Sequence, residues 1–153
     1  SDQTLAGMGK NFTFEEVAAC CCTLLDMNIG VTASVMFGGP GETWETVDEG
    51  MANLRSIEPA YSIIFPGIRV FDGAPLIEIA RREGAVPPGW DGTVPLYYFA
   101  PGIDQEQLHL KLLEGFKGSR YCVYPPSSRN QDLRMINKFG YSKLRNLQLG
   151  ALS

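Results

Sequence analysis

The sequence predicts an α/β fold built around a strand, a tight turn and a helix. Apolar residues alternate over residues 31–37, as they do in a half-buried strand. Gly38, Gly39 and Gly41 follow this strand at once. Apolar residues then recur at helical spacing, and a second apolar run follows at residues 61–65. This order indicates a βαβ unit, whose strands should run parallel with a right-handed crossover.

A helix is expected before this unit, whereas residues 1–12 show little periodicity. Thr13 and Glu16 match a capping box, in which each side chain accepts a hydrogen bond from the other residue's backbone N–H. Gly30 is placed to supply the left-handed residue that ends the helix. The apolar stripe of this helix consists of Phe14, Val17, Ala18, Cys21, Leu24 and Leu25.

The glycine turn has two interpretations that spacing alone leaves open. Glycine is used where a ligand lies against the main chain or where the backbone takes positive φ. It serves equally in a tight strand-to-helix connection that binds nothing. No lysine follows, which excludes a Walker loop, and Gly-Gly-Pro-Gly does not fit the dinucleotide spacing G-x-G-x-x-G.

The chain after the turn continues the α/β pattern. A helical stripe begins at Trp44 and stops before Pro59. The strand at residues 61–65 is interrupted by Pro66 and a glycine, and residues 68–71 resume an extended pattern.

A helix over residues 76–83 comes next, with Pro75 in its first turn and Gly84 at its end. Residues 85–102 contain four prolines and predict a long ordered loop with room for one short edge strand.

Asp104 is placed to cap a further helix, whose stripe includes Leu108, Leu112 and Phe116. His109 borders this stripe. It is the chain's only histidine, so we interpret it as a packed or surface residue rather than a metal ligand.

Charge is divided unevenly along the chain. Residues 1–116 carry 6 Lys and Arg against 16 Asp and Glu, whereas residues 117–153 carry 7 against Asp132 alone. Residues 125–129 read as a linker, and a helix is expected at residues 131–139 before a break and a second helical piece. A basic tail can bind nucleic acid. It can equally dock on its own acidic body or lie in solvent, which we favour.

Composition excludes several classes of protein. The 153 residues, 44% hydrophobic and 20% charged, can bury one ordinary core. No run approaches the roughly 20 apolar residues of a membrane helix, and the N-terminus lacks the form of a signal peptide. We therefore expect a cytoplasmic protein without a membrane partner.

The four cysteines predict free thiols and no metal site. Successive residues on a helix point about 100° apart, so the side chains of Cys20, Cys21 and Cys22 cannot converge. Cys122 is far away along the chain.

The glycine turn also carries a resemblance to a known family. The string Phe37-Gly38-Gly39-Pro40-Gly41-Glu42-Thr43-Trp44-Glu45-Thr46-Val47, with Gly67-Ile68-Arg69-Val70 after the next strand, resembles the cobalamin-binding class of radical S-adenosylmethionine (radical SAM) enzymes. Four further pieces are similar to the family's pattern in order: Ser1-Asp2 with Leu5 and Gly9-Lys10-Asn11-Phe12-Thr13; Ala74-Pro75-Leu76; Arg82-Glu83-Gly84; and Pro95 with Tyr98, Phe99 and Pro101.

This resemblance implies a partial (β/α)6, TIM-like barrel of parallel strands, with S-adenosylmethionine lying across the carboxyl ends of the strands. Open α/β sheets bind ligands at the same edge. In the family, the glycine turn and the main chain after the next strand hold the adenosine of the cofactor. The cofactor-binding residues carried over are Phe37, Gly38, Gly39, Gly41, Glu42, Arg69, Val70 and Phe71. The family continues with Tyr-Pro-Gly-Thr where this chain has Phe-Asp-Gly-Ala.

The resemblance also implies that the chain is part of a longer parent enzyme. The family holds its [4Fe–4S] cluster with C-x-x-x-C-x-x-C, which does not occur here, so no metal ligand is assigned and the cluster and cobalamin belong to the parent alone. Residues 1–103 would be the C-terminal portion of the barrel and residues 104–153 a helical, basic extension. The parent would cleave S-adenosylmethionine reductively for radical chemistry or methyl transfer on an unactivated carbon. Candidate substrate contacts are Tyr97, Tyr98, Arg120 and Tyr121.

Two partners are expected. One is the remainder of the parent enzyme. The other is a second copy, because a barrel that lacks the preceding strand leaves residues 31–37 with an open apolar edge. This predicts a homodimer, edge to edge or swapped, that buries more than roughly 1,000 Å². The helix at residues 104–116 or the basic tail is the alternative cover. The alternative function is a non-catalytic interaction or oligomerisation module whose basic tail docks a partner or RNA.

Overall fold

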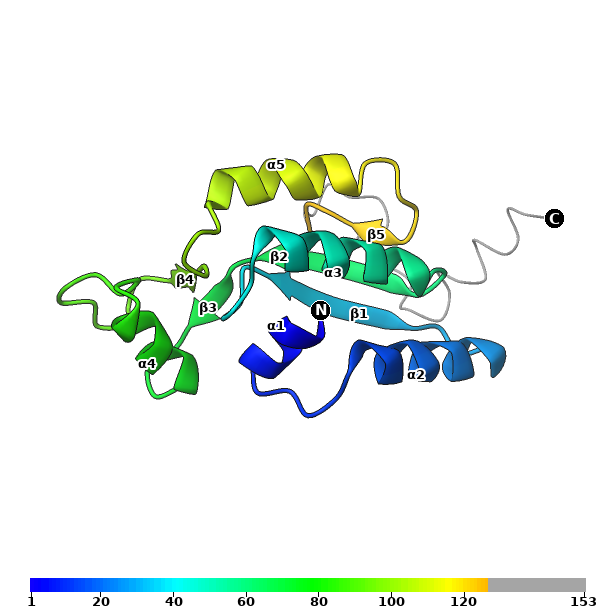
Figure 1. Ribbon diagram of the computed structural model, residues 1–153, viewed down its shortest axis with the longest axis horizontal. Coiled ribbons are helices and arrows are strands. Elements are labelled where there is room, and N and C mark those ends of the chain that lie inside the picture. The colour runs from blue at the N-terminus through cyan, green and yellow to red at the C-terminus, as the bar shows by residue number, and fades with distance from the viewer. Residues whose placement is uncertain (127–153) are drawn as a thin grey trace.

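The computed structural model describes residues 1–126, in which helices and strands form a mixed α/β fold (Figure 1). The basic segment from residue 127, including the helices expected there, lies outside the described residues. None of the described helices combines the length and the apolar character that a membrane crossing requires. The elements are α1 (Asp2–Gly7), α2 (Phe14–Asp26), β1 (Thr32–Phe37), α3 (Trp44–Ser56), β2 (Tyr61–Pro66), β3 (Ile68–Val70), α4 (Pro75–Arg82), β4 (Leu96–Tyr98), α5 (Gln105–Gly115) and β5 (Cys122–Val123).

A parallel sheet of three strands, in the order β1-β2-β5, forms the centre of the molecule. β1 and β2 pair from Thr32 opposite Tyr61 to Phe37 opposite Pro66, and α3 connects them. The parallel βαβ unit predicted from the sequence is therefore confirmed. β5 pairs with the far side of β2 and leaves β1 at the edge of the sheet.

The arm, which comprises β3, α4 and β4, projects from this sheet (Figure 1). β3 and β4 pair antiparallel, with Arg69 opposite Tyr97. This antiparallel pair lies outside the parallel βαβ unit, and the barrel stays a prediction. α4 and the loop that follows it connect the two strands. β4 is the short edge strand expected within residues 85–102.

Helix starts agree with the caps predicted from the sequence. Thr13 and Glu16 form the capping box of α2. Pro75 is the first residue of α4, and the Asp104 carboxylate accepts a hydrogen bond from the Gln107 N–H at the start of α5, at 2.8 Å.

The end of α2 differs from the prediction. The helix stops at Asp26, and the left-handed residue is Asn28, with φ of 66°, rather than Gly30. Asparagine tolerates this conformation because its short polar side chain can hydrogen-bond locally.

α1 is a helix that the sequence pattern did not predict. The Ser1 hydroxyl caps it, and the Gln3 side-chain amide donates a hydrogen bond to the carbonyl of Gly41 at 3.0 Å. Gly7 lets the helix approach the glycine turn closely, since a Cβ there would lie 2.3 Å from the carbonyl oxygen of Pro40. Tertiary contacts with the turn therefore hold a helix that is too short to persist alone.

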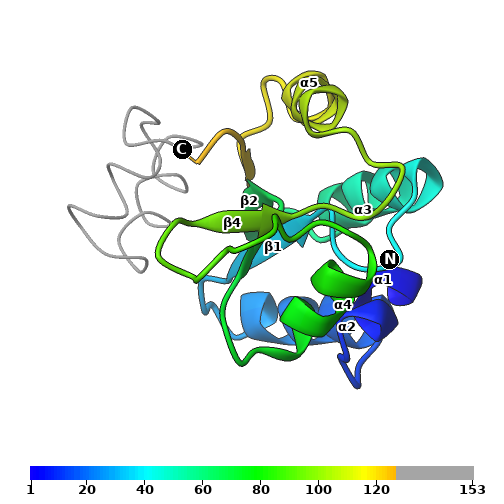
Figure 2. The same cartoon turned by 90° about the vertical axis from the view of Figure 1, so that its left-hand side faces the viewer.

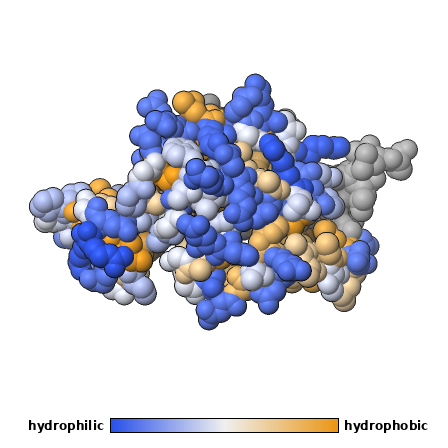
Figure 3. Space-filling view, in the orientation of Figure 1, coloured by the Kyte–Doolittle hydropathy of each residue, from blue (hydrophilic) through white to orange (hydrophobic). Residues whose placement is uncertain are grey.

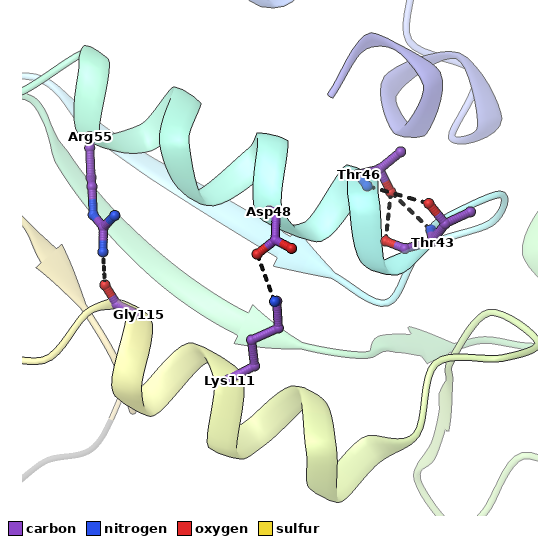
Figure 4. Close-up of polar contacts among 6 residues, drawn as sticks. All are labelled: Thr43, Thr46, Asp48, Arg55, Lys111 and Gly115. Atoms are coloured by element: carbon purple, nitrogen blue, oxygen red, sulfur yellow. Dashed lines mark hydrogen bonds and ion pairs between the residues drawn. The ribbon is translucent and has the colours of Figure 1, made fainter.

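α5 packs against α3 through polar and apolar contacts (Figure 4). Lys111 and Asp48 form an ion pair with an N–O distance of 2.7 Å, and the Arg55 guanidinium donates to the carbonyl of Gly115. Gly115 permits this approach, because a Cβ there would lie 2.5 Å from Cε of Met51. The core that these helices share with the sheet includes the fully buried side chains Tyr98, Ile64, Leu108, Leu112 and Val47.

Candidate functional site

The glycine turn joins β1 to α3 at the carboxyl end of the parallel sheet. Gly38 and Gly41 have positive φ angles of 93° and 77°, which glycine adopts without strain. The carboxylate of Glu42 folds back and accepts hydrogen bonds from the N–H groups of Gly38 and Gly39, the second at 3.1 Å. The turn is therefore closed by its own glutamate.

Glu42 is buried, with 5% of its surface exposed. Burial raises the pKa of this carboxyl, and the N–H groups of Gly38 and Gly39 offset that rise only in part. Because the carboxylate occupies both donors, they are not free to bind an anionic ligand. In the structure, Glu42 therefore holds the turn closed.

A phenylalanine from a distant part of the chain covers the first glycine of the turn. The Phe99 ring lies against Gly38 and also against Gly67, where added Cβ atoms would lie 2.9 Å and 2.6 Å from ring carbons. Both glycines have positive φ, so sterics and backbone conformation each require glycine at these two positions.

The other two glycines of the turn differ in accessibility. A Cβ on Gly39 would lie 3.3 Å from both Sδ of Met8 and Cδ1 of Ile68. Gly41 is exposed, and nothing lies within 4 Å of the position of its absent Cβ. Of the cofactor-binding residues predicted in the turn, Gly41 alone is exposed, and its carbonyl accepts the hydrogen bond from Gln3.

The second predicted segment divides between the two faces of β3. Val70 is buried in the core, with 3% of its surface exposed. Arg69 and Phe71 are exposed, and Cζ of Arg69 lies 4.9 Å from the centroid of the Phe71 ring. This is a cation–π contact. The structure therefore brings Arg69 and Phe71 together and places Val70 elsewhere.

Alternation along β1 identifies the exposed face of the parallel sheet. Phe37 faces α3, because a Cβ on Gly50 of that helix would lie 3.0 Å from the Phe37 ring. Its neighbour Met36 therefore faces away from α3. Met36 is in register with Phe65, and each of these residues has 39% of its surface exposed. Two apolar side chains thus meet solvent at the carboxyl ends of β1 and β2.

The arm has an exposed face of the same kind. Tyr98 is fully buried and its hydroxyl donates to the carboxylate of Glu83, at the end of α4, at 2.5 Å. Tyr98 is therefore unavailable as a substrate contact. Tyr97 points to the other face, opposite Arg69, and is 53% exposed.

Two further candidate substrate contacts, Arg120 and Tyr121, precede β5. Tyr121 packs edge-on against Tyr61, with ring centroids 5.7 Å apart, whereas Arg120 is exposed. Tyr61 is the first residue of β2. Tyr121 therefore lies at the opposite end of the sheet from the glycine turn.

The cysteines and the histidine do not form a metal centre. Cys21 is buried in α2, while Cys20 and Cys22 are exposed. Burial, followed by the charges of its two neighbours, raises the pKa of the Cys21 thiol. His109 contacts Tyr124, with 2.6 Å between Nδ1 and the phenol oxygen. Within residues 1–126, no group of three or more His, Cys, Asp or Glu side chains is arranged to hold a metal ion.

A cavity of about 370 Å³ follows the edge of β1. It is lined by all of residues 33–37, which point alternately to opposite faces, so it runs along the main chain at the strand's edge. α1, α2 and α3 supply apolar walls that include Leu5, Val17 and Leu54. Figure 3 shows apolar side chains gathered over α2. Among the described strands, β1 pairs with β2 alone.

Comparison with known proteins assigns no relative. No family model matches this chain. Searches of curated proteins and of solved structures also found no match.

Proposed function

We propose that this chain forms the adenosine-binding part of a radical SAM enzyme of the cobalamin-binding class. The observation that carries the proposal is the exposed face at the carboxyl ends of the strands, where Arg69 and Phe71 lie together. Ligands of open α/β sheets bind at this edge. Gly41 is exposed, and the empty space at the position of its absent Cβ leaves room for a ligand.

The site supported by the geometry is smaller than the one implied by the resemblance. Gly41, Arg69 and Phe71 would hold the cofactor, whereas the buried residues Gly38 and Gly39 shape the turn. In the parent, S-adenosylmethionine, a [4Fe–4S] cluster and cobalamin would supply the radical or methyl group for an unactivated carbon. The remainder of that enzyme is the first partner of this chain.

Replacing Gly41 by valine tests the proposal in the full-length parent. A Cβ there meets open space in the structure, so valine should block a bound ligand rather than a protein contact. The matched control is Gly89→Val, since Gly89 has nearly the same φ, 76° against 77°, and equally open space. Calorimetry should show that Gly41→Val abolishes S-adenosylmethionine binding and that the control does not. Equal affinities, with unchanged helicity by circular dichroism, would contradict the proposal.

A second candidate function, association through β1, is favoured by the cavity along its edge. The carbonyls of Val31 and Phe37 accept hydrogen bonds from Tyr61 and Gly67 on the β2 side. Residues of the other parity, such as Ser34, therefore direct their main-chain N–H and C=O groups toward the open edge. No charged side chain lies on β1 to discourage pairing. We propose that a second copy of this chain pairs there.

Light scattering at micromolar concentrations tests this association. The wild-type chain should have the mass of a dimer, and Ser34→Pro should be monomeric. Proline removes an N–H on the open side while the hydrogen bonds to β2 remain. A monomeric wild type, or a dimer that Ser34→Pro leaves intact, would contradict pairing through this edge.

A further inference from the structure

The cavity along β1 separates the edge of this strand from α1 and α2. Both helices lie on the side of β1 that faces away from β2 (Figure 1, Figure 2). The cavity has a volume of about 370 Å³, which is within the range of ligand pockets. It includes residues 33–37 of the strand, so it follows the main chain for about 13 Å. The room therefore lies where a further strand would pair with β1.

The open edge of β1 selects a ligand that has a peptide backbone. The carbonyls of Val31 and Phe37 accept hydrogen bonds from the β2 side, so the N–H and C=O of Ser34 point toward the cavity side. Donors and acceptors thus alternate along the edge, and an extended peptide matches this pattern. An aliphatic chain would cover these polar groups without offering them a partner, which is costly. The cavity is therefore suited to an extended peptide rather than to a lipid chain.

The walls of the cavity select apolar side chains at alternate positions of that peptide. Leu5 and Val17 line the part formed by α1 and α2. Leu54 and Ile57 line the part formed by α3 and the residue that follows it. Every second side chain of an extended peptide points to the same face. Two apolar residues that are two positions apart would therefore both face these walls.

A lysine lies near one end of the cavity. Of the described residues that line it, Lys10 and Glu42 alone have charged side chains. The Glu42 carboxylate accepts the N–H groups of the glycine turn. Lys10, in contrast, forms no ion pair with a carboxylate within residues 1–126. Lys10 comes two residues after Met8, which packs against Gly39 beyond the carboxyl end of β1. The cation is therefore close to the point where a strand parallel to β1 would finish.

We propose that the cavity binds the C-terminal end of a partner polypeptide as a strand parallel to β1, with its free carboxylate paired to Lys10. The strand edge, the apolar walls and the lysine each recognise a different part of this ligand. The site does not depend on the proposed cofactor chemistry. It uses the edge at which a second copy is proposed to pair, so the peptide and the second copy should exclude each other.

Fluorescence anisotropy of a labelled peptide tests the site on the 153-residue chain. The probe is acetyl-Lys-Thr-Val-Thr-Val, labelled on its lysine, in which the two valines share one face and the last residue has a free carboxylate. This acid probe should bind saturably. The same peptide with a C-terminal amide should bind about five-fold more weakly, as expected for the loss of one partly exposed ion pair. The inverted peptide acetyl-Lys-Val-Thr-Val-Thr keeps the composition and the carboxylate but turns its valines away from the walls, and its affinity should be about ten-fold lower.

Variants of the chain test the role of the lysine and of the strand edge. Lys10→Gln should remove the preference for the free carboxylate, so that the acid and the amide bind equally. The matched control is Lys117→Gln, because Lys117 pairs with Glu114 and does not line the cavity. This control should keep the five-fold preference. Ser34→Pro should abolish binding of both peptides, since it removes a main-chain donor from the open edge.

Three results would overturn the proposal: no saturable binding of the acid probe, equal affinities of the acid and the amide in the wild type, or equal affinities of the acid probe and the inverted peptide. Light scattering distinguishes this site from the proposed association of two copies. If the acid probe binds with its dependence on Lys10 while the wild type is monomeric, the peptide site stands and the pairing of copies fails. If the wild type is a dimer that Ser34→Pro dissociates, and no probe binds, the pairing stands and the peptide site fails.

Discussion

Replacing Gly67 by alanine tests the packing that joins the arm to the sheet. Gly67 has φ of 74°, and an added Cβ would lie 2.6 Å from Cζ and 2.8 Å from Cε2 of Phe99. The left-handed backbone costs a residue with a Cβ roughly 1–2 kcal/mol. Overpacking against a ring adds roughly 1–3 kcal/mol. Gly67→Ala should therefore lower the free energy of unfolding by roughly 2–5 kcal/mol.

Two further variants separate the backbone cost from the steric cost. Gly89→Ala has nearly the same φ, 76°, and no atom within 4 Å, so it should show the backbone cost alone. Phe99→Ala removes the ring that the new Cβ would meet. The double variant Gly67→Ala/Phe99→Ala should then be more stable than the sum of the two single losses predicts, by roughly 1–3 kcal/mol.

Urea unfolding followed by tryptophan fluorescence measures these differences, provided the dependence on urea is the same in each variant. A loss in Gly67→Ala no larger than the loss in Gly89→Ala would refute the steric argument. The steric argument would also be refuted if the stability loss of the double variant equalled the sum of the two single losses to within about 0.5 kcal/mol.

Further predictions concern the turn and α5. Glu42→Ala should cost roughly 1–3 kcal/mol in urea unfolding, because it leaves two buried N–H groups without an acceptor. Burial raises the pKa of Glu42, so its contribution to stability is full below the ordinary value of 4.5 and is lost as pH rises through the folded pKa. The stability of wild type relative to Glu42→Gln should therefore fall as pH rises above the ordinary value of 4.5, and a constant difference would contradict the raised pKa. Leu112→Ala, at a fully buried position, should cost roughly 2–5 kcal/mol. Leu110 lies on the same helix and is 58% exposed, so Leu110→Ala should cost less than about 0.5 kcal/mol. Similar losses of stability in Leu112→Ala and Leu110→Ala would contradict the packing of α5.

Elements defined by local chemistry could be predicted from the sequence. The capping box at Thr13, the cap at Asp104 and the proline at the start of α4 depend on residues within one turn of helix. The parallel pairing of β1 and β2 follows from a strand, a helix and a second strand in succession. Each of these features is encoded within a short stretch of chain.

Elements held by distant contacts could not be predicted. α1 is too short to be stable alone and depends on the contact of Gly7 with Pro40. β5 has two residues and exists because Cys122 and Val123 reach β2. The cover of the glycine turn comes from Met8 and Phe99, which lie far from it along the chain. Spacing identified the turn, but it could not indicate which of its glycines the rest of the fold would bury.

The alternating pattern of β1 indicates which face is covered, but it does not identify every side chain left at the surface. Thr32 and Ser34 mark the open face, whereas Met36 on the same face is apolar. The contact between Phe37 and α3 shows which face the helix covers, and Met36 and Phe65 are then left at the surface. Strands of parallel sheets are normally apolar on both faces because both faces are covered. We therefore expect the apolar groups on this open face to be covered in the working protein, by a ligand at the carboxyl ends or by another segment of polypeptide.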